Sequence, residues 1–149
     1  MRICAALVCV CLGLGASPVF AHGSPQIFHG SEGGIVHAIL AVPAEPATFY
    51  AATSQAGVFM STDRGRHWRP VNTGLARVNV LSLAADPVTP ATIYAGTSGG
   101  LFKSTDAGAT WRMAGTELAD EQIKALLPDP KDAKTIYAGT VHGLWRSTD

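Results

Sequence analysis

Paired carboxylates would give this chain the chemistry of glycoside hydrolysis, which needs a proton donor facing a base or a nucleophile. Among its 11 acidic residues, Asp63, Asp106 and Asp149 recur every 43 residues, and Asp86 and Asp129 recur at the same interval in Asp-Pro pairs. A catalytic group is needed once per site, so recurring residues are predicted to be structural. A pair of the remaining acidic residues could act as acid and base, but the favoured interpretation is that they are ordinary solvated charges in loops. These remaining residues are Glu32, Glu45, Glu117, Asp120, Glu121 and Asp132.

Histidine offers one further candidate for chemistry. Cleavage after Ala21 would make His22 the N-terminal residue, whose amine and imidazole could chelate copper if His29 or His37 came close. No ligand set stands at a fixed spacing, so a polar leader that begins with histidine is favoured. The chain also lacks G-x-S-x-G, H-E-x-x-H and phosphate-loop motifs. No catalytic residue, metal or cofactor is predicted.

Two octapeptides provide the framework that would position any such groups. Residues 61–68 are S-T-D-R-G-R-H-W, residues 104–111 are S-T-D-A-G-A-T-W, and a third copy begins at 147–149. We expect a tight turn in which the Asp carboxylate accepts backbone hydrogen bonds and Gly supplies a positive φ. Thr and Trp then open the next strand, and the Trp packs between sheets. The residues assigned this structural role are Ser61, Asp63, Gly65, Trp68, Ser104, Asp106, Gly108, Thr110, Trp111, Ser147 and Asp149.

Strand candidates repeat with the same period. They lie at 35–41, 49–53, 57–61 and 67–71, then at 78–84, 92–96, 100–104 and 110–114, and finally at 122–127, 135–139 and 143–147. Four short strands in a period of about 40–45 residues are typical of a β-propeller blade. A two-sheet sandwich would instead show alternation and no fixed period. The sequence therefore predicts an all-β partial propeller of about three antiparallel blades, 35–77, 78–121 and 122–149, the last incomplete.

These residues resemble a known family. The octapeptides are similar to the Asp-box, or bacterial neuraminidase repeat, of sialidases, xyloglucan-cleaving glycosidases, sortilin-like receptors and photosystem assembly factors. The segments T-I-Y-A-G-T and G-L-F-K-S within 86–104 look most like the last three groups. The resemblance covers residues 35–149 and implies a propeller whose Asp-box turns lie at the blade periphery, away from the central face where ligands bind.

The resemblance to sialidases would imply a site in which three arginines bind a carboxylate beside a Tyr–Glu nucleophile pair. Here Arg69 and Arg112 recur directly after the octapeptide Trp, whereas Arg64, Arg66 and Arg77 do not recur. All three tyrosines share one repeated position, so none stands out. No sialidase motif is present.

Aromatic residues also recur. Phe59, Phe102 and Trp145 share one strand position, and Trp68 and Trp111 share another. A carbohydrate platform is one interpretation, but recurrence at the blade period favours packing between blades.

The N-terminal segment has the pattern of a signal peptide. Arg2 precedes an apolar run at 3–15, and residues 19–21 fit a signal-peptidase site. The run is too short for a membrane-spanning helix, which needs about 20 residues. Residues 1–21 are therefore expected to be removed, residues 22–34 to form a flexible leader, and the product to be exported to the periplasm or beyond. All three cysteines, Cys4, Cys9 and Cys11, would leave with the signal peptide.

Net charge is zero, which gives no reason to expect a nucleic-acid partner. The sequence favours an exported, non-catalytic propeller segment with a binding or scaffold surface for an unknown protein or carbohydrate. The enzyme alternative is a fragment of a glycosidase resembling the xyloglucan-cleaving group, with its catalytic pair outside this chain. Because propellers close with about four to eight blades, three blades predict an open stack that self-associates or requires further blades.

Overall fold

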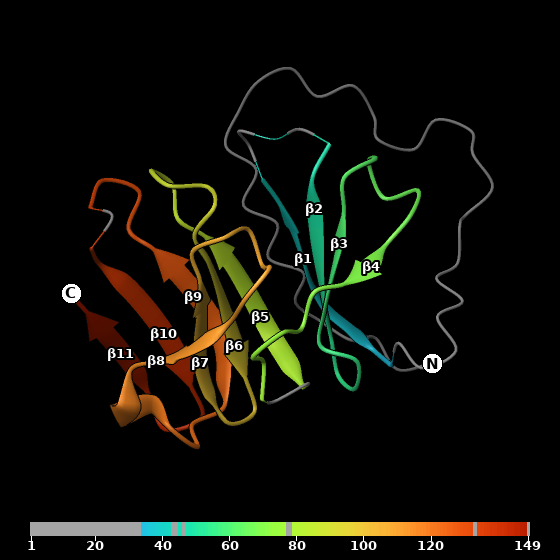
Figure 1. Cartoon of the computed structure of the whole chain (residues 1–149). Helices are drawn as coiled ribbons and strands as arrows, with labels where there is room; N and C mark the ends of the chain where they lie inside the picture. The colour runs from blue at the N-terminus through green and yellow to red at the C-terminus, as the bar shows by residue number, and fades with distance from the viewer. Residues whose placement is uncertain (1–33, 43–44, 46, 77–78, 133, 149) are drawn as a thin grey trace, which may run out of the picture.

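The computed structural model describes residues 34–42, 45, 47–76, 79–132 and 134–148. Three antiparallel sheets stand side by side like a partly opened fan, as Figure 1 shows. We call them the first, second and third blade. Their strands are β1 (Val36–Ala41), β2 (Phe49–Thr53), β3 (Val58–Ser61) and β4 (Arg69–Pro70); β5 (Val80–Ala85), β6 (Ile93–Thr97), β7 (Gly100–Ser104) and β8 (Arg112–Ala114); and β9 (Ile123–Pro128), β10 (Ile136–Thr140) and β11 (Leu144–Ser147).

The predicted all-β architecture is confirmed, and every predicted strand has a counterpart. The fourth strands are shorter than expected, however, because they begin at Arg69 and Arg112 rather than at residues 67 and 110. The amides of His67 and Thr110 donate to the Asp side chains of their turns, so they are not available for strand pairing. The turn therefore extends into what the sequence pattern marked as strand.

One element was not predicted. A short 3-10 helix, Thr116–Leu118, lies in the connection between the second and third blades. It begins after Gly115, whose φ is 72°, and it places Leu118 in the core between these blades. The sequence shows little sign of it, because a single helical turn has no periodicity.

The first strands of the three blades, β1, β5 and β9, share one irregularity. Each has an extra residue in its pairing with the second strand of the blade, and His37, Leu81 and Lys124 occupy this position. A bulge increases the local twist of a strand and bends it. Its recurrence at the blade period shows that the three sheets are built on one plan.

Two core clusters lie between the blades. One joins the first and second blades through residues that include Tyr50, Val58, Ile93 and Phe102, and the other joins the second and third through residues that include Leu101 and Ile123. Strand β6 is buried along its whole length because a blade lies on each side of it. Both faces of the second blade can therefore be apolar.

The recurring aromatic side chains differ in burial from one blade to the next. Phe102 and Trp111 of the second blade are buried, as interblade packing requires. Phe59 and Trp68 of the first blade are only half-buried. Trp145 of the third blade is exposed, so the interpretation as packing holds for the second blade and not for this residue.

Several sequence-based expectations fall outside the described residues. These are the signal peptide, most of the leader and its histidines His22 and His29, Glu32, Arg77 and Asp149. The described part of the chain contains no helix with the length and apolar character that crossing a membrane requires.

Candidate functional site

Because neighbouring strands of a blade are antiparallel, the connections between them lie alternately at the two ends of the blade. The β1–β2 and β3–β4 connections, and their counterparts in the second blade, lie at one end, which we call the turn end. The β2–β3 connections and the links between blades lie at the other, which we call the link end. The two octapeptides therefore lie together at the turn end.

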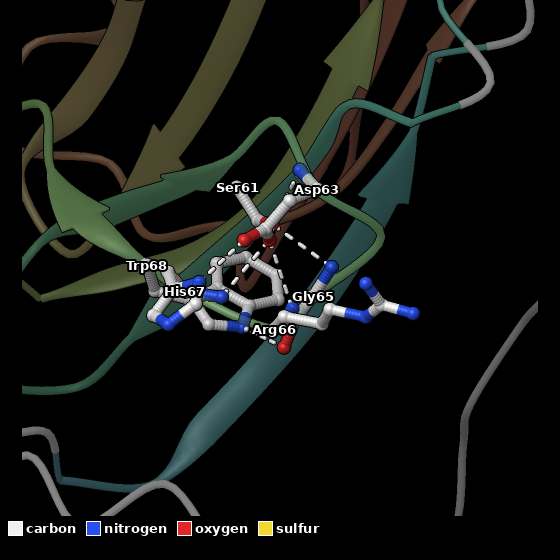
Figure 2. Close-up of polar contacts among 6 residues, drawn as sticks. All are labelled: Ser61, Asp63, Gly65, Arg66, His67 and Trp68. Carbon is white, nitrogen blue, oxygen red and sulfur yellow. Dashed lines mark hydrogen bonds and ion pairs between the residues drawn. The ribbon is translucent and has the colours of Figure 1, made fainter.

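The residues of the first octapeptide form hydrogen bonds with one another (Figure 2). Ser61 Oγ donates to Asp63 Oδ1 at 2.8 Å and accepts from the amide of Gly65 at 2.8 Å. Asp63 Oδ1 accepts from the amides of Arg66 and His67, both at 2.9 Å. The second carboxylate oxygen lies 2.6 Å from Nδ1 of His67. Every polar atom of this carboxylate is thus engaged within its own turn.

The second octapeptide repeats this geometry with a different last partner. Ser104 Oγ donates to Asp106 Oδ1 at 2.7 Å and accepts from the amide of Gly108 at 2.8 Å. Asp106 Oδ1 accepts from the amide of Thr110 at 2.8 Å, and the Thr110 hydroxyl donates to Oδ2. The backbone hydrogen bond expected of Asp106 is therefore present, and Thr110 replaces the histidine of the first turn.

These hydrogen bonds stabilise the charged form of both carboxylates. The amide and ring of His67 hold the pKa of Asp63 far below its usual range. The hydroxyl and amide of Thr110 and the hydroxyl of Ser104 lower the pKa of Asp106 to about 2. A carboxyl group with so low a pKa is ionised at neutral pH and cannot serve there as a proton donor.

Contacts also run from the second turn to the first blade. The hydroxyl of Tyr50 donates to the carbonyl oxygen of Ala107 at 2.9 Å, and the indole Nε1 of Trp111 donates to that of Val71 at 2.7 Å. In the first turn, the indole of Trp68 donates instead to Gly65 O of the same turn. The third copy is described only as far as residue 148, which includes Ser147 at the end of β11.

Other acidic residues also organise connections. Asp86 accepts from the amides of Val88 and Thr89, and Asp129 accepts from that of Lys131. Asp132, whose sequence position predicts a solvated loop charge, accepts from the amide of Lys134 and the hydroxyl of Thr135. The Lys134 amide is the main cause of its lowered pKa.

The link end brings together a pair that the sequence did not reveal. Nδ1 of His142 lies 3.1 and 3.0 Å from the two carboxylate oxygens of Glu121. The Glu121 side chain is 18% exposed and that of His142 73%, so the pair is open to solvent from the histidine side. The two residues lie 21 positions apart on different connections, and no motif joins them. Two other acidic residues lie on the same connection as Glu121: Glu117 is in the 3-10 helix, and Asp120 has a positive φ of 68°.

A cavity of about 500 Å³ lies at the turn end, between the first and second blades. Glu45, which the sequence placed in a solvated loop, contributes its only charged side chain among the described residues. The rest of the lining is mostly apolar and includes Tyr50, Met60 and Pro90. No group of three or more His, Cys, Asp or Glu side chains suited to a metal ion occurs in the described ranges.

No protein-family model matches this chain, and no curated protein matches it. Solved structures do. An ancestral GH74 enzyme is 29% identical with a TM-score of 0.67 over 73% of the chain, and the Niastella koreensis GH74 enzyme is 25% identical with a TM-score of 0.63 over 76%. The GH74 xyloglucanase of Xanthomonas campestris, 20% identical, has a TM-score of 0.62 over 79%.

A fourth match, the structure of YCF48 bound to D1 peptide, is 17% identical with a TM-score of 0.56 over 76% of the chain. The chain spans only 14% of the ancestral enzyme, 21% of each of the other two GH74 structures and 37% of YCF48. These structures are β-propellers. Together with the three stacked antiparallel sheets, they show that the chain has the fold of part of a β-propeller.

Proposed function

We propose that this chain is a set of Asp-box blades in an exported propeller protein, where it provides a binding surface and not a catalytic centre. One observation carries the proposal. The residues that recur in the sequence are engaged in holding turns and blades, as Asp63, Asp106 and Trp111 illustrate. Ligand recognition is therefore assigned to the non-repeated residues of the link end.

The identification of the turns as Asp-boxes rests on both pattern and geometry. In each described turn, a Ser hydroxyl accepts from the Gly amide while the Asp carboxylate accepts from the amide four residues after it. A tight turn that must satisfy its own backbone amides requires these residue types at this spacing.

A β-glucan chain is the ligand class that the likenesses favour. The sequence pattern resembles xyloglucan-cleaving glycosidases, and two of the similar structures, at 29% and 25% identity, are GH74 enzymes. Xyloglucan is therefore the first ligand to test. Affinity electrophoresis in gels containing xyloglucan should retard the chain, whereas gels containing starch should not. Equal mobility in both gels would contradict the proposal.

A pair of histidine variants locates the binding surface. His142 at the link end and His67 at the turn end are both exposed and both paired with a carboxylate. We expect His142→Ala to weaken retardation by xyloglucan and His67→Ala to leave it unchanged. The reverse result would move the binding surface to the turn end.

The second candidate is a portion of a glycoside hydrolase, and the Glu121–His142 pair is the observation that favours it. A glycosidase also needs a second carboxylate within about 5–9.5 Å of the first. In this interpretation the second group comes from another part of the protein. Release of reducing ends from xyloglucan by the whole protein that contains this chain, lost in Glu121→Gln, would replace the binding proposal with this one.

Export is part of the proposal and rests on the N-terminal pattern. If residues 1–21 are a signal peptide, the chain recovered outside the cytoplasm begins at His22. N-terminal sequencing is the measurement. Recovery of a folded extracytoplasmic chain that retains Met1 would contradict it.

A further inference from the structure

The two outermost sheet faces carry apolar residues that are more exposed than their counterparts at the interfaces between blades. The leading face, on the side of the first blade away from the second, carries Val36 and Ile39. The trailing face, on the side of the third blade away from the second, carries Leu127, Tyr137 and Leu144. These faces lie at opposite ends of the fan in Figure 1, on the sheets of β1–β4 and β9–β11.

On the leading face, exposure follows the absence of a neighbouring blade. Val36 is 46% exposed, while Val80 and Ile123, at the same position in the next blades, are fully buried. Ile39 is 62% exposed, while its counterparts Leu83 and Leu126 pack against the core clusters. Side-chain type changes little along these series, and no blade of the described residues lies beyond the leading face, which accounts for the difference.

The trailing face shows the same relationship in the opposite direction. Leu144 is 76% exposed, whereas Leu101 and Val58, at the same position in the preceding blades, are 5% and 0% exposed. Leu127 is likewise 57% exposed where its counterpart Ala84 is buried.

The interfaces between neighbouring blades within the chain indicate which residues would pack against these two faces. Val58 of the first blade and Val80 of the second belong to one core cluster. Leu101 of the second blade and Ile123 of the third belong to the next. Continuing the series pairs Leu144 with the residue at the position of Val80 and Ile123, which in this chain is also occupied by Val36.

A polar contact follows the same series. Across the first interface, the Tyr50 hydroxyl donates to the carbonyl oxygen of Ala107. Tyr137 occupies the position of Tyr50 on the trailing face. Arg64 occupies the position of Ala107, and the two share a positive φ, 62° and 55°. The two turns also have matching hydrogen bonds, so we expect the carbonyl group of Arg64, on the first blade, to take the direction of that of Ala107.

We propose that the trailing face of one copy of this chain packs against the leading face of a second copy, with Leu144 near Val36 and Ile39 and the Tyr137 hydroxyl donating to Arg64 O. The inference is independent of the proposed function. The pairing is head to tail, so each copy uses two different faces. Counting only the three described blades of each copy, two such contacts would close a ring of six, within the range of about four to eight that propellers use.

The experiment is sedimentation velocity over a concentration series. The chain is expressed with its own N-terminal segment, so that any processing takes place. We expect a concentration-dependent dimer of twice the 15.5 kDa chain mass, or twice the processed mass. Leu144→Asp and Ile39→Asp should each sediment as monomers. Val88→Asp is the matched control, because Val88 is 66% exposed but lies on the β5–β6 connection, away from both faces, and this variant should dimerise normally.

Mixing the two monomeric variants tests the head-to-tail arrangement. Leu144→Asp keeps its leading face and Ile39→Asp keeps its trailing face, so an equimolar mixture should recover a dimer that neither variant forms alone. Near-UV circular dichroism of each variant checks that the fold is intact. A wild-type monomer at every concentration, a dimer that both variants retain, or a well-folded mixture that stays monomeric would each overturn the proposal.

Discussion

The indole nitrogen of Trp111 lies 2.7 Å from the carbonyl oxygen of Val71, 40 residues earlier, and joins the second blade to the first. Trp68, at the same repeat position, donates to Gly65 O within its own turn. One residue type therefore stabilises an interface in one blade and a turn in the other. Trp111 can make its contact because the second blade packs against the first, and the octapeptide pattern alone does not distinguish the two residues.

This relationship predicts unequal effects of one substitution. Trp111→Phe keeps an aromatic side chain, although a smaller one, and removes the donor, which leaves the buried Val71 carbonyl oxygen without this partner. The free energy of unfolding should fall by about 1–3 kcal/mol. Trp68→Phe should cost less, because Trp68 is half-buried and its partner lies in an exposed turn. Urea titration of both variants is the measurement, and equal losses would contradict the assignment.

Ser104 should matter more to stability than its neighbour Thr105. Ser104 is buried, and its hydroxyl oxygen accepts from the buried amide of Gly108. Ser104→Ala leaves this amide unpaired, so we expect a loss of about 1–3 kcal/mol in the free energy of unfolding. Thr105 is exposed, and Thr105→Ala should change stability by less than about 0.5 kcal/mol. Guanidinium titrations that show no loss for Ser104→Ala would refute this role.

The repeat explains how much of the structure the sequence could predict. Asp106 and Gly108 stand at fixed positions in a local turn, so their spacing alone indicated the turn and its hydrogen bonds. The sheet order followed because four short strands per period leave few other arrangements. The fold could therefore be predicted from the local chemistry of the turns and the regular spacing of the strands.

The link end could not be predicted in this way. Glu121 and His142 belong to two connections that meet only when the second and third blades pack together. The exposure of Trp145 also depends on the packing around its blade, because its counterpart Phe102 is buried. Both features depend on contacts distant in sequence, which a repeat pattern does not contain.

Gly96 and Gly139 occupy the same repeat position but should respond differently to alanine. A Cβ added at Gly96 would lie 2.3 Å from Ser82 Oγ and 2.6 Å from the carbonyl oxygen of Ile123, at the interface of the second and third blades. At Gly139 the nearest atom would lie at an ordinary 3.4 Å. Gly96→Ala should lower the free energy of unfolding by about 1–3 kcal/mol through overpacking. Gly139→Ala should be close to neutral, and thermal melting of both variants tests the difference. Similar melting temperatures would mean that the interface can shift to accept the methyl group.

Acid should destabilise the fold through the two turns. The pKa of Asp106 falls from 3.8 to about 2 on folding, and that of Asp63 falls further. A carboxyl group whose pKa is lower in the folded state contributes stability that is fully present above the pKa of the unfolded chain. This contribution is lost as the pH falls through the folded pKa, so the urea midpoint should decrease between about pH 4 and pH 2.

Two variants assign part of this loss to the second turn. Asp106→Asn removes the ionisable group, so the urea midpoint should fall less steeply below pH 4, while Asp63 and Asp132, whose pKa is also lowered, maintain the remaining slope. Thr110→Val removes the hydroxyl that contributes most to the lowered pKa of Asp106, so its slope should lie between those of the wild type and Asp106→Asn. Both variants are expected to be less stable at pH 7, where the hydrogen bonds of the turn are complete. A midpoint that falls with the wild-type slope in both variants would show that the acid sensitivity of this fold arises outside the turn.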